Sequence, residues 1–231
     1  MSTKLKYQIL SEDCSKIDLN FKIIIVGDSG VGKSCISIKA SRNYFEDFYS
    51  PTIGLEFLSF NIRVEDKNIK LQIWDTCGQE IFRSLITSYF RNASLAIIVY
   101  SIEREESFSN IETWLNEIKT HSNPDIKIFL IGNKADLEDK REVTKESGEN
   151  FYKDHKLSFF AETSAKTGHN IKNVFIEVAK VLYNQYKEIN NKMSRKESAN
   201  SATDTEENNN KLSLETGEGE GENRRRKKKC C

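Results

Sequence analysis

Short apolar segments recur along the first 160 residues of the chain. The first, Phe21–Val26, is too short for a buried helix and has a glycine behind it, so it predicts a central parallel strand. Further apolar segments predict three more strands, at 95–102, 126–131 and 157–160. Apolar residues also repeat at helical spacing over 108–118 and over 171–182, which predicts two amphipathic helices.

Two segments with alternating apolar and polar residues predict a β-hairpin. Apolar residues take every second position from Leu58 to Val64 and from Ile69 to Ile73, with turn formers between them. Strands that alternate with helices indicate a doubly wound α/β fold. We therefore predict a three-layer α/β domain with a mostly parallel six-stranded sheet, one antiparallel edge hairpin and helices on both faces.

The composition separates a globular part from a polar C-terminal part. The chain has 231 residues, of which 37% are hydrophobic and 30% charged. Residues 190–231 contain no aromatic residue and seven apolar ones, so they cannot offset the entropy of ordering. We expect an N-terminal extension at 1–20, one domain at 21–188 and a disordered tail at 189–231.

Charge and cysteine usage narrow the class of protein. The net charge of zero hides an acidic segment at 204–222 followed by six consecutive cations at 224–229. The five cysteines are an odd set without zinc-like spacing, which argues against a disulfide framework and a structural metal. The longest apolar run has six residues, against roughly 20 needed to span a bilayer, and we see no signal peptide. We expect the chain in the cytosol.

The segment that follows the first predicted strand has the spacing of a phosphate-binding loop. Gly27–Ser34 reads GDSGVGKS, which satisfies GxxxxGK[ST] and opens a helix. Its glycines let backbone N–H groups approach phosphates, Lys33 supplies a cation for the β- and γ-phosphates, and Ser34 offers a hydroxyl to Mg²⁺. The alternative is a glycine-rich turn that binds nothing, and the loop alone names neither the base nor the reaction.

Two later segments point to the nucleotide. Asp75 follows the second hairpin strand, where a Walker-B carboxylate would hold Mg²⁺, and Gln79 four residues later suits the orientation of a water. The sequence NKAD at 133–136 follows another strand at its carboxyl end. Asp136 can accept hydrogen bonds from guanine N1–H and the 2-amino group, whereas adenine has no donor at either place. Taken singly this segment could be an ordinary turn, but after the other two motifs it predicts GTP and GDP as ligands.

With these motifs the chain resembles small GTPases of the Ras superfamily, and within it the Rab family, over about residues 20–186 and at the last two residues. The resemblance implies that Thr52 binds Mg²⁺ and senses the γ-phosphate, that Gly78 donates its N–H to that phosphate, and that Phe45 stacks near the guanine. Ser164-Ala165-Lys166 looks like the family's fifth box, which contacts the edge of the base.

The resemblance extends these roles to a full set of site residues. The implied nucleotide-binding residues are Ser29, Gly30, Val31, Gly32, Lys33, Ser34, Cys35, Phe45, Thr52, Gly78, Asn133, Lys134, Asp136, Ser164, Ala165 and Lys166. The implied catalytic residues are Gln79, Lys33 and Thr52. The implied ligands of Mg²⁺ are Ser34, Thr52 and Asp75.

The hairpin also carries two large aromatic residues in its polar phase. Phe57 and Trp74 alternate out of step with the apolar positions, so either a neighbouring segment covers them or they form an exposed patch. In Rab proteins the matching aromatics, with Tyr89, are similar to an effector-binding triad. We therefore predict an effector surface formed by Ile53, Gly54, Phe57, Trp74 and Tyr89.

The resemblance to the Rab family rests on four internal segments and the terminal cysteine pair. These are Ile53–Phe57, Lys70–Trp74, Phe82–Leu85, Ser88–Ala93 and Cys230-Cys231. Cys77, Ile81, Phe90 and Asn92 depart from the usual Rab residues and leave the set of partners open. The organelle and the transport step are not specified by these residues.

The leading interpretation is a switch that binds GTP, hydrolyses it slowly and recruits effectors in intracellular membrane trafficking. One rival is a module that holds nucleotide without turnover, and another is a phosphotransferase for a small metabolite. The resemblance implies an exchange factor, a GAP, a GDP-dissociation inhibitor and prenylation machinery as partners. We expect a monomer with no nucleic-acid partner.

The end of the chain predicts a lipid anchor. The resemblance to Rab proteins implies geranylgeranyl groups on Cys230 and Cys231, and two lipid chains hold a protein on a bilayer more firmly than one. The cations at 224–229 would add attraction to an anionic leaflet. We expect the protein on the cytoplasmic face of intracellular membranes, cycling with the cytosol. The alternative, a charged segment that only serves solubility, leaves the cysteine pair unexplained.

Overall fold

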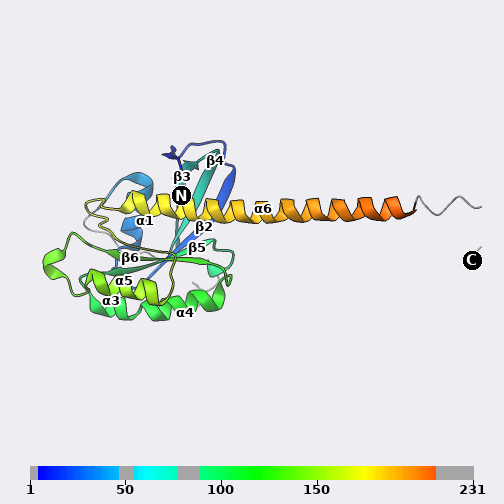
Figure 1. The fold of residues 1–231 in the computed structure, drawn as a ribbon. Coiled ribbons are helices and arrows are strands. Elements are labelled where there is room, and N and C mark those ends of the chain that lie inside the picture. Colours follow the sequence, from blue (N-terminus) through cyan, green and yellow to red (C-terminus); the bar gives the residue numbers. More distant parts are fainter. Residues whose placement is uncertain (1–4, 47–54, 77–88, 212–231) are drawn as a thin grey trace, which may run out of the picture. The chain divides into compact units, whose positions relative to one another are not determined.

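The computed structural model describes residues 5–46, 55–76 and 89–211 (Figure 1). The chain divides into two compact units, Met1–Gln185 and Tyr186–Cys231. Of the described elements, the first unit contains the sheet and every helix except the C-terminal part of the last one. Within the described residues no helix is long and apolar enough to cross a membrane.

Strands and helices alternate along most of the first unit. The strands are β1 (Tyr7–Ile9), β2 (Leu19–Val26), β3 (Leu55–Val64), β4 (Lys67–Thr76), β5 (Leu95–Ser101), β6 (Lys127–Asn133) and β7 (Phe159–Glu162). The helices are α1 (Lys33–Arg42), α3 (Glu105–Ser109), α4 (Ile111–His121), the 3₁₀ turn η2 (Glu138–Lys140), α5 (Lys145–Asp154) and α6 (Ile171–Lys211).

The strands form one sheet in the order β1-β3-β4-β2-β5-β6-β7. The pairs β2–β4, β2–β5, β5–β6 and β6–β7 are parallel, whereas β3–β4 and β1–β3 are antiparallel. The predicted mostly parallel α/β sheet with an antiparallel edge hairpin is therefore confirmed. Among the described residues the sheet has seven strands instead of the predicted six, because β1 adds a strand outside the hairpin.

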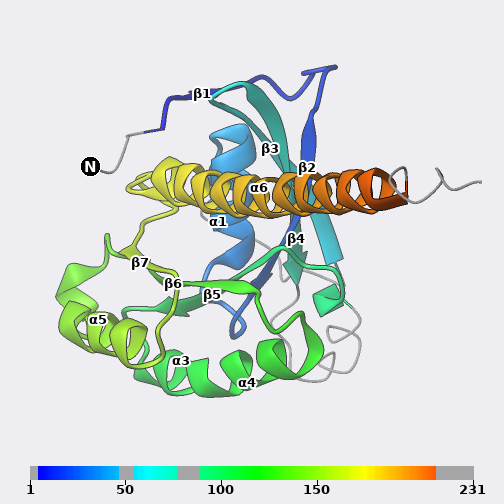
Figure 2. The same cartoon turned by 45° about the vertical axis from the view of Figure 1, so that its right-hand side comes forward.

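Both faces of the sheet are covered, as Figure 2 shows, with α1 and the part of α6 in the first unit on one face and α3, α4 and α5 on the other. Strand β2 is buried on both faces, so its apolar run divides by alternation: Ile23 and Ile25 join the α1 and α6 side, and Ile24 joins the α4 side. This explains why the run is continuous, as expected of a central parallel strand.

The N-terminal extension carries β1 and then runs across the hairpin. Glu65 N–H donates to Lys6 O (3.0 Å), Leu10 N–H donates to Asn61 O (2.9 Å), and the Asn61 side-chain amide donates to Ser11 O (3.0 Å). The sequence prediction had only an extension here, because three strand residues are too few to show alternation.

The helices differ from the sequence prediction at two places. The single helix predicted over 108–118 is two helices, α3 and α4, which meet at Asn110. Helix α5 was not predicted, because it is mostly charged and polar; its half-buried Phe151 lies 5.9 Å, ring to ring, from Phe108. Thr144 is its N-cap and accepts a hydrogen bond from Ser147 N–H (3.1 Å). A threonine at this position is the one sequence signal that could have indicated where the helix begins.

Helix α6 buries one face in the first unit, through Val174, Phe175, Val178 and Leu182. The second unit is helical from Tyr186 to Lys211. The disordered tail that the composition predicts at 189–231 stays a prediction. The remainder of the predicted tail lies outside the described residues.

We expect the contact between the N-terminal segment and the hairpin to contribute to stability. Asn61 is 4% exposed and its amide also donates to Glu12 O (3.1 Å). Asn61→Ala should lower the free energy of unfolding by about 1–3 kcal/mol, because it leaves the carbonyls of two residues without their donor. Urea denaturation measures this, with Asn116→Ala on the exposed side of α4 as the control. Equal stability of the two variants would show that the hydrogen bonds of the Asn61 side chain contribute nothing to stability.

Candidate functional site

The predicted site segments meet at the carboxyl ends of the parallel strands. The loop 27–34 follows β2, Asp75 lies near the end of β4 and opposite Ile25 of β2, and the segments 133–136 and 163–166 follow β6 and β7. Ligands of open α/β sheets bind at this edge. The structure therefore places the motifs at one edge of the sheet, although they are far apart in the sequence.

The loop after β2 depends on glycine at two positions. At Gly27 φ is +141°, and an added Cβ would lie 2.1 Å from Val99 O. At Gly32 φ is +95°, and an added Cβ would lie 2.3 Å from the Asn133 side-chain nitrogen. Only glycine fits both the conformation and the space, so the loop packs directly on β5 and on the end of β6.

The side chain of Lys33 lies across this loop. Its Nζ donates to Gly27 O (2.8 Å) and to Asp28 O (2.7 Å), and the residue is 5% exposed. These bonds hold the ammonium group over the backbone of the loop, beside the N-terminus of α1. A cation next to a helix N-terminus favours an anionic ligand such as a phosphate group.

Ser34 and Asp75 form a buried oxygen-rich pair beside Lys33. The Ser34 hydroxyl donates to Asp75 Oδ2, and Asp75 is fully buried. Burial raises the pKa of Asp75 to about 6, opposed by the Ser34 hydrogen bond and by the charge of Lys33. The other oxygen of Asp75, Oδ1, has no hydrogen-bond partner in the part of the chain that the structure describes. A buried carboxylate oxygen of this kind, next to a hydroxyl, fits the oxygen ligands that Mg²⁺ prefers.

Three donors from the α3–α4 region hold the outside of the loop. The Asp28 carboxylate accepts from Asn110 Nδ2 (2.8 Å) and from Trp114 Nε1 (2.9 Å), and Arg104 Nη2 donates to Ser29 O (2.8 Å). Sequence reasoning missed these residues. They lie 75 to 86 positions from their partners, and no motif links them to the loop. Asn110 is also the residue that separates α3 from α4.

The side chain of Asn133 connects the loop after β2 with the two later loops. Its Nδ2 donates to Val31 O (2.9 Å), and its Oδ1 accepts from Thr163 Oγ1 (3.2 Å) and from Ala165 N–H (3.3 Å). Asn133 is buried, so these contacts are shielded from water. Thr163 was not among the predicted site residues, and it acts here by fixing Asn133.

Asp136 and Ser164 lie opposite each other at the tips of the two later loops. The Ser164 hydroxyl donates to Asp136 Oδ1 (2.5 Å) and accepts from Thr167 N–H (3.1 Å). Asp136 is exposed, so its carboxylate is accessible to the N–H donors of a ligand. Lys134 pairs with Glu103 (2.5 Å) and adopts φ +66°, which turns the chain sharply between Asn133 and Asp136.

Three further predicted nucleotide contacts, Phe45, Cys35 and Lys166, are described by their burial and packing. Phe45 is partly buried and packs against the core on the α1 side. Cys35 is partly buried at the start of α1, and burial raises the pKa of its thiol, with a further contribution from Asp75. Lys166 is exposed.

The aromatic residues in the polar phase of the hairpin form a connected group. Phe57 and Trp74 are opposite each other in the register, with ring centroids 6.1 Å apart, and Trp74 lies 5.8 Å from Tyr89. Lys22 Nζ lies 3.9 Å from the centre of the Trp74 ring. Phe57 is 51% exposed, whereas Trp74 and Tyr89 are half-buried against the α4-side core, so the group is partly accessible.

Several predicted residues lie outside the described residues, and their predictions are not tested by the structure. They are Thr52, Ile53, Gly54, Gly78, Gln79, Cys230 and Cys231.

The arrangement combines a glycine loop with a buried lysine, a Ser–Asp oxygen pair and an exposed aspartate held by a second loop. Comparison with known families agrees with this site. Residues 22–184 match the model of the Ras family, whose members are small GTPases that bind guanine nucleotides. This match covers well over half of the chain, and the chain therefore belongs to the Ras family.

Proposed function

We propose that this Ras-family GTPase is a Rab-type switch that recruits effectors to intracellular membranes while it holds GTP. The observation that carries the proposal is the connected group of Phe57, Trp74 and Tyr89, in which Trp74 directly precedes Asp75 on β4. Partly exposed aromatic residues of this kind are common at the centre of protein interfaces. The terminal cysteine pair and the cations before it support membrane attachment.

The proposed reading of the base rests on Asp136. Its carboxylate accepts hydrogen bonds from guanine N1–H and from the 2-amino group. The Ser164 hydroxyl, which donates to Asp136 Oδ1, holds the carboxylate in position. Adenine presents neither donor, so the same carboxylate would be left without partners. Lys134 and Lys166 flank this position on the two loops, and Ala165 N–H is fixed by Asn133.

The proposed hydrolysis depends on residues around the phosphates. Lys33 would stabilise the charge on the β- and γ-phosphates, and Ser34, Thr52 and Asp75 would hold Mg²⁺, which offsets the negative charge that develops during phosphoryl transfer. Gln79 would orient the attacking water. Asp75 is already buried beside Ser34 and Lys33, so its charge is better balanced when a cation is present.

The proposed cycle needs regulators and a membrane anchor. Slow intrinsic hydrolysis calls for a GAP, and tight nucleotide binding calls for an exchange factor. The lipid groups on Cys230 and Cys231 would be added by prenylation machinery and shielded in the cytosol by a GDP-dissociation inhibitor. Ile53 and Gly54 would complete the effector surface next to Phe57. The protein would thus cycle between the cytosol and the cytoplasmic face of a membrane.

We expect Asp136 to decide which base is bound. Asp136→Asn replaces a carboxylate, which accepts two hydrogen bonds, by an amide, which also donates one. Xanthine carries a carbonyl in place of the 2-amino group of guanine, so the amide of the variant suits xanthine better. The preference for GDP over xanthosine diphosphate should fall by about 100-fold or more. Competition binding measures this, with Asp139→Asn in η2 as the control. Retained preference for GDP would refute the base assignment.

We expect hydrolysis to need Gln79. Single-turnover hydrolysis of bound GTP should be slow in the native protein, on the order of 10⁻⁴ to 10⁻² per second, and Gln79→Leu should slow it at least about tenfold, because the water is no longer oriented. Binding of GTP should stay unchanged. Gln8→Leu on the exposed β1 is the matched control. An unchanged rate in Gln79→Leu would remove this residue from the mechanism.

We expect membrane attachment to need both terminal cysteines. In cells, the double variant Cys230→Ser/Cys231→Ser should move entirely to the soluble fraction and still bind nucleotide, because no lipid chain can be attached. Cys14→Ser is the control and should distribute like the native protein. Neutralising the cations at 224–229 should redistribute the protein among membranes without full release. The lipid-anchor proposal fails if the double variant sediments with membranes.

A further inference from the structure

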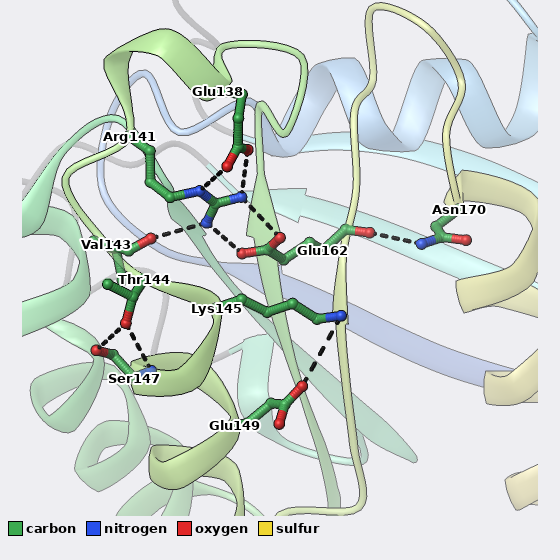
Figure 3. A network of polar contacts seen from close by, with 9 residues as sticks. All are labelled: Glu138, Arg141, Val143, Thr144, Lys145, Ser147, Glu149, Glu162 and Asn170. Atoms are coloured by element: carbon green, nitrogen blue, oxygen red, sulfur yellow. Dashed lines mark hydrogen bonds and ion pairs between the residues drawn. The ribbon is translucent and has the colours of Figure 1, made fainter.

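An ion pair lies just outside the two loops that we assign to the base. Arg141 follows Asp136 by five residues, after the η2 turn, and Glu162 is the last residue of β7, directly before Thr163. Figure 3 shows the guanidinium of Arg141 and the carboxylate of Glu162 facing each other. Each loop is therefore connected, within a few residues, to one member of the pair.

The two side chains form a bidentate contact. Arg141 Nη1 donates to Glu162 Oε1 (2.6 Å) and Nη2 donates to Oε2 (3.0 Å). The side chains are 17% and 11% exposed, so water screens the contact little. Two parallel hydrogen bonds fix the direction as well as the distance between the groups.

The other donors of Arg141 are also used. Nε and Nη2 donate to the Glu138 carboxylate (2.8 and 2.7 Å), and Nη1 donates to Val143 O (2.9 Å). All five N–H donors of the guanidinium thus have an acceptor, so the side chain cannot rotate without losing several hydrogen bonds. Lysine, with three donors on a flexible stem, cannot replace this planar arrangement.

The pair reaches the base-binding loops through short backbone connections. Thr163 N–H donates to Gly132 O (2.8 Å), and Ala135 N–H donates to Thr163 O (2.9 Å). On the other side, Glu162 O accepts from Asn170 Nδ2 (2.9 Å), next to the start of α6. A shift of Glu162 would therefore be transmitted to the loop that carries Ser164, the partner of Asp136.

A second ion pair lies on α5, close to the first in Figure 3. It differs from the first in its distance, in its exposure and in the segments that it joins. Lys145 Nζ lies 4.0 Å from Glu149 Oε1, with the side chains 64% and 43% exposed. Both residues belong to one helix turn and connect no loops. Exposed pairs of this type contribute little.

We propose that Arg141 and Glu162 are positioning residues for guanine recognition: their ion pair sets the spacing of the loops 133–136 and 163–166, and so holds Asp136 where it reads the 2-amino group of the base. This inference rests on the proposed role of Asp136. It assigns to the pair a specificity effect at the base, with no effect on the hydrolysis step at the phosphates.

The experiment measures affinities for GDP and for inosine diphosphate, which lacks the 2-amino group. In Arg141→Met and in Glu162→Gln, the preference for GDP over inosine diphosphate should fall about ten- to a hundredfold, because a displaced carboxylate no longer meets that group. Single-turnover hydrolysis of preloaded GTP should stay within about twofold of the native rate. Arg141→Lys should recover only part of the preference.

The controls are Lys145→Met and Glu149→Gln, which should keep the native preference. A purely structural role would weaken both nucleotides equally, and an unchanged ratio in Arg141→Met or Glu162→Gln, whatever the thermal stability, overturns the proposal. If Arg141→Met does not fold, Glu162→Gln and Arg141→Lys decide. Asp136→Asn is measured in parallel: if it keeps the preference for GDP over xanthosine diphosphate, the base assignment itself is wrong, independently of the ion pair.

Discussion

The carboxamide of Asn133 is the contact on which the rest of the nucleotide site depends. Its nitrogen donates to Val31 O in the phosphate-binding loop, and its oxygen accepts from Thr163 and Ala165 in the second base-binding loop. An amide offers a donor and an acceptor on one short side chain, which an aspartate or a leucine does not. The close approach that Gly32 permits brings the phosphate loop to this amide. The phosphate end and the base end of the site are therefore held at a fixed separation.

A second constraint is electrostatic. Lys33, Ser34 and Asp75 bury an ammonium group, a hydroxyl and a carboxylate in a small volume, and Asp75 has a raised pKa because burial disfavours its charged form. Ser34 and Lys33 compensate the buried carboxylate only in part, because Asp75 Oδ1 has no hydrogen-bond partner among the described residues. A ligand that carries both phosphate charges and a cation relieves this, so binding should stabilise the folded chain by mass action. The burial of these charged and polar groups thus favours an anionic ligand that binds together with a metal ion.

The features that the sequence predicted correctly are formed by residues that lie close together along the chain. The loop at 27–34, Asp75 and the NKAD segment were found because strand, turn and chemistry lie within a few residues, and Phe57 and Trp74 were found because alternation placed them in the polar phase. The residues that support the site were missed: Arg104, Asn110 and Trp114 act from 75 to 86 positions away. Strand β1 was missed because three residues are too few to show an alternation of apolar and polar positions. Helix α5 was missed because it has few apolar residues that could show helical spacing. The roles of Thr52, Gly78 and Gln79 remain predictions.

The geometry of β4 connects the nucleotide site to the aromatic surface. Side chains alternate along a strand, so the consecutive residues Trp74 and Asp75 face opposite sides of the sheet. Asp75 lies in the buried site with Ser34, whereas Trp74 contacts Phe57 and Tyr89 and carries Lys22 over its ring. Strand β4 is hydrogen-bonded on both sides, to β2 and to β3, so its backbone moves as a unit with its neighbours. Asp75 in the buried site and Trp74 in the aromatic group are therefore separated by a single peptide unit, on opposite faces of one strand.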